Sequence, residues 1–80
     1  MARIVFAGYL LDLLNGLPLS DLELIEEKTA PLARFPRMYP IRQKGRFRRH
    51  RWVRAGNWIL YYEVVDETVY IRNIWPARIP

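Results

Sequence analysis

The sequence predicts an α+β fold in which two N-terminal helices pack on one face of a three- to four-stranded antiparallel sheet. Two observations support this prediction. Apolar residues recur at helical spacing before residue 35, whereas three runs rich in aromatic and β-branched residues follow residue 45. Helices followed by a strand meander are typical of a domain whose helices cover one sheet face. We expect a single domain over residues 1–80, a length near the lower limit for a self-sufficient core.

The first helix is expected over residues 8–15. Asn15 and Gly16 form a good C-terminal stop for this helix. The residues RIVF that precede it could form a short strand. The apolar face of the helix is formed by Phe6, Leu10, Leu13, Leu14 and Leu17.

The second helix is expected over residues 20–34. Ser20 and Glu23 have the spacing of a capping box, which marks a helix start. Pro31 lacks a backbone N–H, so we expect it to disturb the last turn and split off a short final helix. The apolar stripe of this helix consists of Leu22, Ile25, Thr29 and Leu32.

The central strand is expected over residues 58–65, with the sequence WILYYEVV. Both of its faces are mostly apolar, which is typical of a strand with neighbours on both sides. The short polar turn Asp66-Glu67 leads into the strand ETVYIRNIW. On that strand we expect Val69, Ile71 and Trp75 to alternate with Thr68, Tyr70 and Arg72.

The arginine-rich run FRRHRWVR, residues 47–54, is expected to form the first strand of the meander. It precedes Ala55-Gly56-Asn57, a glycine-containing hairpin connection. Phe47 and Trp52 would anchor it to the sheet. Because its pattern is not a clean alternation, we expect a bulge near His50. The arginines of this run then project from the sheet or from its edge, where charge also blocks unwanted strand pairing.

Basic residues are concentrated in one acid-free stretch. The chain carries a net charge of +5, and ten of its 13 Lys and Arg residues lie between residues 28 and 62, where no Asp or Glu occurs. This asymmetry predicts a strongly positive face. Such a face suits phosphate backbones or an acidic protein partner.

Cysteine and histidine content excludes several kinds of site. The chain has no Cys and one His, so disulfides, thiolate metal sites and histidine clusters are not expected. We expect no metal and no cofactor. The N-terminal apolar run is interrupted by Asp12, is too short to span a membrane and lacks a small-residue cleavage site. We therefore expect a cytoplasmic protein that does not engage a membrane.

Two segments carry a resemblance to a known family. The segment LARFPRMYP, followed by GNWILYYEVVDETVYIRNIWPAR, resembles the RelE/ParE superfamily of type II toxin–antitoxin toxins. The resemblance covers roughly residues 32–78 and is weak before Ser20. The residues that match the second-strand pattern of the superfamily are Gly56, Asn57, Trp58, Leu60, Tyr62 and Val64. Those that match the third-strand pattern are Val69, Ile71, Arg72 and Arg78.

The resemblance implies a small growth inhibitor that a cognate antitoxin silences through an acidic or amphipathic segment. RelE-like members cut mRNA in the ribosome, and ParE-like members inhibit DNA gyrase. Either target, ribosome-bound mRNA or gyrase, is therefore expected from the resemblance.

Two positions depart from the ribonuclease pattern of that superfamily. Ile59 stands where many members have Arg, and Pro76 stands where many have His. Endoribonuclease activity is therefore left open, with Arg78, His50 and Arg51 as the catalytic candidates. The candidates for binding nucleic acid or a protein target are Arg46, Arg48, Arg49, Arg51, Arg54, Arg72 and Arg78.

Two alternatives from other classes fit the same residues. One is a non-toxic nucleic-acid-binding module that uses the arginine–aromatic face, whose binding would depend steeply on salt. The other is an adaptor whose basic face meets an acidic protein segment.

Overall fold

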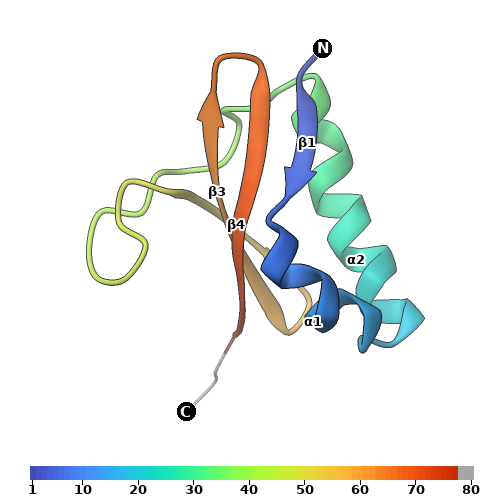
Figure 1. Cartoon of the computed structure of the whole chain (residues 1–80). Coiled ribbons are helices and arrows are strands. Elements are labelled where there is room, and N and C mark those ends of the chain that lie inside the picture. The colour runs from blue at the N-terminus through green and yellow to red at the C-terminus, as the bar shows by residue number, and fades with distance from the viewer. Residues whose placement is uncertain (78–80) are drawn as a thin grey trace.

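The computed structural model describes residues 1–77 and contains four strands and two α-helices in that range (Figure 1). A 3-10 turn over Gly8–Leu10 leads into α1, and another over Ala30–Ala33 follows α2. In chain order the elements are β1 (Arg3–Phe6), α1 (Leu11–Asn15), α2 (Leu19–Thr29), β2 (Arg51–Ala55), β3 (Trp58–Val65) and β4 (Thr68–Pro76).

The sheet has the order β1-β4-β3-β2. The meander β2-β3-β4 is antiparallel, as predicted, whereas β1 lies beside β4 and runs parallel to it. A parallel pair requires a long crossover, and here both helices and the following loop lie between β1 and the meander. The predicted α+β fold is confirmed, with a mixed sheet in place of an entirely antiparallel one.

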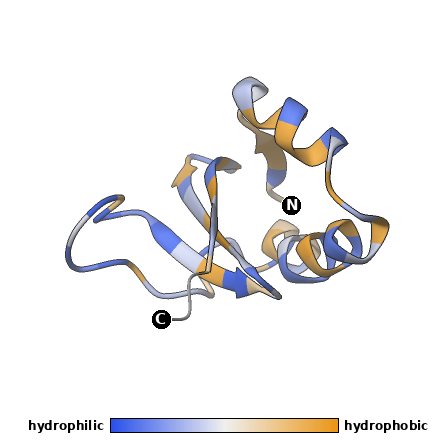
Figure 2. Ribbon diagram, turned by 90° about the horizontal axis from the view of Figure 1, so that it is seen from below, coloured by the Kyte–Doolittle hydropathy of each residue, from blue (hydrophilic) through white to orange (hydrophobic). Residues whose placement is uncertain are grey.

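The hydrophobic core lies between the helices and one face of the sheet. Figure 2 shows α1 and α2 on one side of the strands and the loop before β2 on the other. Leu32, Leu60 and Tyr62 are completely buried in this core. Burying an aliphatic side chain of this size contributes about 1.5–3 kcal/mol relative to leaving it exposed. The remaining core residues are Leu10, Ile25, Val53, Ala55, Val69, Ile71 and Ile74.

Helix α2 begins differently from the sequence prediction and ends as predicted. Its N-cap is Pro18, and no side chain caps it, so the predicted Ser20–Glu23 capping box does not form. The carbonyl of Pro18 already accepts the backbone N–H groups of Asp21 and Leu22, which places Ser20 inside the first turn. The last turn becomes a 3-10 helix at Pro31, as predicted. No helix in the described range is long and apolar enough to cross a membrane.

A bulge on β4 changes which side chains face the core. Tyr62 pairs with Ile71 and Tyr61 pairs with Asn73, so Arg72 is an extra residue on β4. Beyond this point the alternation is inverted: Ile74 is buried, and Trp75, which was expected to share a face with Ile71, is 40% exposed. The sheet irregularity therefore lies at Arg72, and the bulge predicted near His50 is wrong.

The arginine-rich run is a strand only from Arg51 onward. Phe47 and Arg49 have φ angles of 63° and 74°, in the left-handed region that a strand does not use. Residues 42–50 instead form a closed loop, here called the arginine loop. Backbone hydrogen bonds from Arg42 N to His50 O and from Arg49 N to Arg42 O, both 2.8 Å, close its base.

The Gly56→Ala substitution tests the hairpin between β2 and β3. Gly56 has φ +62°, and an added Cβ would lie 2.8 Å from Leu24 Cδ1. We expect the free energy of unfolding, measured by urea denaturation, to fall by about 1–2 kcal/mol, mainly because alanine is strained at this positive φ, since the end of the Leu24 side chain can move aside. Gly8→Ala is the matched control, because nothing lies within 4 Å of its added Cβ. Equal stability of the two variants would contradict the described hairpin packing.

Candidate functional site

The sheet face opposite the helices carries the candidate site. Cross-strand partners share a face, and the pairs Trp52–Tyr61, Ile59–Trp75 and Glu63–Tyr70 all point away from the helices. This face is rich in aromatic side chains. The arginine loop lies on this side of the sheet, away from α1 and α2 (Figure 1).

Phe47 packs the arginine loop against this face. Its ring centroid lies 4.5 Å from that of Tyr61 and 5.9 Å from that of Trp75. Tyr61 retains only 6% exposure, although no helix covers it. Aromatic pairs at such separations contribute about 0.5–1.5 kcal/mol beyond the area they bury. The loop is therefore a packed part of the fold.

Three arginines lie over rings of this face. The guanidinium carbon of Arg42 lies 5.7 Å from the ring centroid of Tyr61. The corresponding distance is 4.9 Å from Arg46 to Trp75 and 4.7 Å from Arg72 to Tyr70. These distances are within cation–π range. We call this surface the aromatic–arginine face; it consists of Phe47, Tyr61, Tyr70 and Trp75 with Arg42, Arg46 and Arg72.

Glu63 is a site residue that the sequence analysis missed. Its Oε2 accepts a hydrogen bond from Arg72 Nε at 2.8 Å and lies 3.8 Å from His50 Nε2. The other ring nitrogen of His50 lies 3.4 Å from the carbonyl oxygen of Arg48. A carboxylate beside a histidine can orient the ring for proton transfer. Glu63 follows Tyr61 by two residues, so strand alternation alone could have placed it on this face.

The predicted arginines do not form one patch. Strand alternation places Arg54 on the same face as Ile59, whereas Arg51, opposite Tyr62, is on the helix-covered side. Arg54 Nε donates to its own turn, at Gly56 O, 2.9 Å away. Among the other binding candidates, Arg46 and Arg72 belong to the aromatic–arginine face, and Arg48 and Arg49 are exposed in the arginine loop. Arg78 lies outside the described residues.

Arg51 has a structural role. Its Nη1 donates to the carbonyl oxygens of Arg37 at 3.2 Å and Tyr39 at 2.8 Å. The Tyr39 hydroxyl in turn donates to Lys28 O at 3.0 Å. These bonds fix the segment between α2 and the arginine loop along the outer edge of β2.

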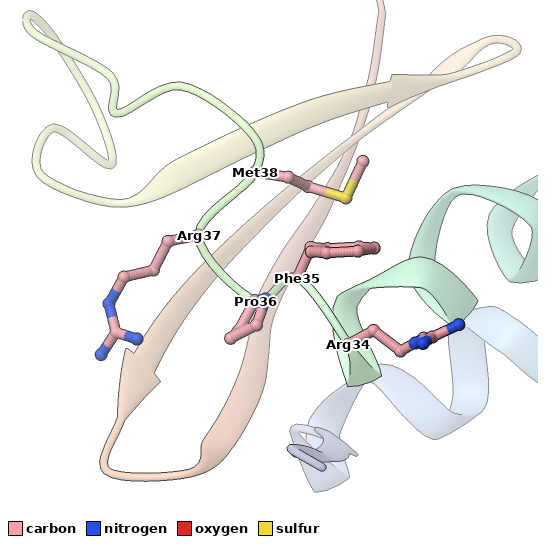
Figure 3. Close-up of a pocket in the computed structure, with 5 residues that line it drawn as sticks. All are labelled: Arg34, Phe35, Pro36, Arg37 and Met38. Carbon is pink, nitrogen blue, oxygen red and sulfur yellow. The ribbon is translucent and has the colours of Figure 1, made fainter.

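The segment Arg34–Met38 forms an exposed apolar hollow of about 420 Å³ (Figure 3). Phe35 is 60% exposed and Met38 is 49% exposed. Figure 3 shows the side chains of Arg34 and Arg37 extending in opposite directions from this hollow. Apolar surface bordered by cations is typical of a protein–protein contact.

Tyr62 carries a buried polar atom without a partner. Within the described part of the chain its hydroxyl makes no hydrogen bond, although it lies near the Tyr39 backbone and the Arg51 guanidinium. Burial raises the pKa of Tyr62 above its ordinary value of 10.0, and proximity to the Tyr39 backbone and Arg51 offsets this only in part. Burial also raises the pKa of Tyr39, helped by the charge of Glu27.

Residues 1–77 hold no group of three His, Cys, Asp or Glu side chains close enough to bind a metal ion.

Two helices packed on a mixed four-stranded sheet are consistent with the RelE/ParE type of fold. The model of the family described as ParE toxin of type II toxin-antitoxin system, parDE, matches residues 12–79. The chain belongs to this ParE toxin family, and membership implies an antitoxin partner. The match begins inside α1 and leaves out β1. No curated protein and no solved structure matches the chain significantly.

Arg51→Ala tests the structural role of Arg51. Losing two hydrogen bonds from a charged donor should lower the free energy of unfolding by about 2 kcal/mol, as measured by urea denaturation. Arg54→Ala removes the same charge from an exposed site and should cost about 0.5 kcal/mol or less. If Arg51→Ala leaves stability unchanged, Arg51 does not anchor this segment.

The raised pKa values of the two tyrosines predict a loss of stability in alkali. Folding favours the neutral phenols, so their contribution is complete below pH 10 and is lost as pH rises through the folded pKa values. The free energy of unfolding should therefore begin to fall as the pH rises past about 10, the ordinary pKa of tyrosine. Tyr62→Phe should make that fall smaller, because Tyr39 is then the one left of the two tyrosines whose pKa is raised. Identical pH profiles for the two proteins would contradict the burial of the Tyr62 hydroxyl.

Proposed function

We propose that the protein arrests bacterial growth by binding DNA gyrase without catalysis, and that its cognate antitoxin relieves the arrest. The observation that carries this proposal is the environment of Ile59. This side chain lies on the sheet face opposite the helices, paired with Trp75 and Arg54, where ribonuclease members of the superfamily often have arginine. Membership of the ParE family supports the same target, since ParE-like members inhibit gyrase.

The chemistry of RNA cleavage gives a second reason. A 2′-hydroxyl must lose a proton while an anionic phosphorane is stabilised by preorganised donors. On the aromatic–arginine face, Arg42 and Arg46 lie over rings and Arg72 is paired with Glu63. Pro76, at the end of β4, offers no side-chain proton donor. Trp, Tyr and Arg are the residues enriched at protein-binding hot spots, so this face suits a protein target better than an RNA-cleaving centre.

The antitoxin partner fits the remaining basic surface. An amphipathic segment could place apolar side chains in the Phe35–Met38 hollow and carboxylates near Arg34 and Arg37. Rim charges of this kind speed association with an acidic partner and make it dependent on ionic strength.

One observation favours mRNA cleavage as the second candidate. His50 Nε2 lies 3.8 Å from Glu63 Oε2, a distance that supports a role for His50 as general base. The two candidates share the toxin class and the antitoxin, and they differ in target and in the need for His50.

Expression in bacteria, with plasmid supercoiling and protein synthesis followed separately, tests the proposal. Expression alone should arrest growth with an early loss of negative supercoiling, and co-expression of the antitoxin should restore growth. Trp75→Ala should weaken gyrase inhibition roughly thirtyfold, the cost of losing a hot-spot aromatic. His50→Ala should arrest growth as the unaltered protein does.

If mRNA is cut while supercoiling stays intact, and His50→Ala abolishes the cutting, the protein is a ribonuclease and not a gyrase inhibitor. Normal growth at high soluble expression would overturn both candidates.

A further inference from the structure

We propose that the open edge of β3 carries a phosphate-binding pocket built by Arg37, Arg49 and Arg51. A cavity of about 220 Å³ lies there, and all three arginines line it together with Tyr62 and Val64. None of the three arginines belongs to the aromatic–arginine face. The pocket is therefore a second basic site and does not depend on which target the toxin inhibits.

The pocket forms because β3 extends beyond the end of its pairing with β2. β2 pairs with β3 only as far as Tyr62, which lies opposite Arg51, so within residues 1–77 no strand pairs with Glu63–Val65 on that side. Because the hairpin loop has two residues, Ala55 and Trp58 form a hydrogen-bonded pair, and the N–H of Trp58 points towards β2. The N–H groups of every second residue of β3 point the same way, so the N–H of Val64 points towards the open edge. The pocket thus contains a backbone N–H donor beside the arginines.

The backbones that carry these arginines are held in place before any ligand binds. Arg51 is fixed by its bonds to the carbonyl oxygens of Arg37 and Tyr39, which also fix the backbone that carries the Arg37 side chain. Figure 3 shows that side chain extending away from Arg34, towards the end of β3. Arg49 is held at φ 74°, an unfavourable conformation for arginine, by the bond from its N–H to Arg42 O. Because Arg49 keeps this unfavourable backbone conformation and also lines the pocket, we infer a functional role for its side chain.

The charge in the pocket is strongly positive. One carboxylate, Glu63, also lines it, but Arg72 Nε already donates to Glu63 Oε2 at 2.8 Å. Tyr62 also lines the pocket, and its side chain is completely buried. Planar guanidinium groups with a backbone N–H form the donor set that tetrahedral oxyanions prefer, and phosphate in particular.

The size of the pocket selects a single phosphate group. It is smaller than the range of about 300–1,000 Å³ usual for whole ligands, so the rest of a phosphorylated ligand stays outside. The open edge presents one N–H and one C=O, at Val64, which is too little for an added peptide strand. The ligand is either free phosphate or one phosphate of a nucleotide or nucleic acid strand.

Titration of the purified full-length chain with inorganic phosphate, followed by amide chemical shifts, tests the proposal. Binding should be saturable, with the largest shifts at Arg49 and Val64. Arg49→Gly should weaken binding about tenfold, the loss of one charge-assisted hydrogen bond, while keeping its melting temperature because glycine accepts a positive φ. Lys44→Gln removes the same charge from the same loop and should change affinity less than about twofold.

Titrations with adenosine monophosphate and with single-stranded oligonucleotides identify the source of the phosphate. Oligonucleotide binding that is tighter than phosphate binding and sensitive to Arg49→Gly assigns the pocket to a nucleic acid backbone; equal affinities assign it to a free phosphate group. The proposal is overturned if phosphate binding does not saturate or if Arg49→Gly and Lys44→Gln lose the same amount of phosphate affinity. Binding of a glutamate-rich peptide that carries no phosphate would also overturn it. These measurements need no toxicity, so their failure is distinct from failure of the gyrase assignment.

Discussion

The fold depends on shielding both faces of β3 from water. Leu60 and Tyr62 are buried on one face and Tyr61 on the other. Helices α1 and α2 cover only the first face, so the arginine loop covers the second through Phe47. Exposing an aromatic side chain of this size would cost about 1.5–3 kcal/mol, a large share of the stability of an 80-residue chain. The most basic stretch of the chain is therefore held in place by its own aromatic residues.

Most of the fold could be predicted from the sequence, because it rests on local patterns. The helical stripe containing Ile25, the break at Pro31 and the apolar strand 58–65 are all periodicity or backbone-chemistry signals, and the structure confirms them. The predicted strand over residues 47–50 and the predicted bulge near His50 are wrong. Left-handed backbone at Phe47 and the bulge at Arg72 depend on contacts with distant residues, which no local pattern reveals.

The candidate site was harder to predict for the same reason. Ten basic residues in one acid-free stretch suggested a single positive face, but the structure distributes the arginines among three roles. Arg42 and Arg46 lie over rings of the aromatic–arginine face, and Arg51 fixes the chain at the outer edge of β2. Arg49 lies at the open end of β3. The density of charged residues in the sequence predicts the sign of the surface charge. The position of each guanidinium group depends on strand register and on how the loop closes.

The arginine loop is an ordered cap on Tyr61 and not a mobile arm. Backbone ¹⁵N relaxation of residues 42–50 in the full-length protein tests it most directly. The structure predicts order parameters near 0.85 across the loop, as in the strands, together with ring–ring contacts between Phe47 and Tyr61. Order parameters below about 0.6, without those contacts, would contradict the claim.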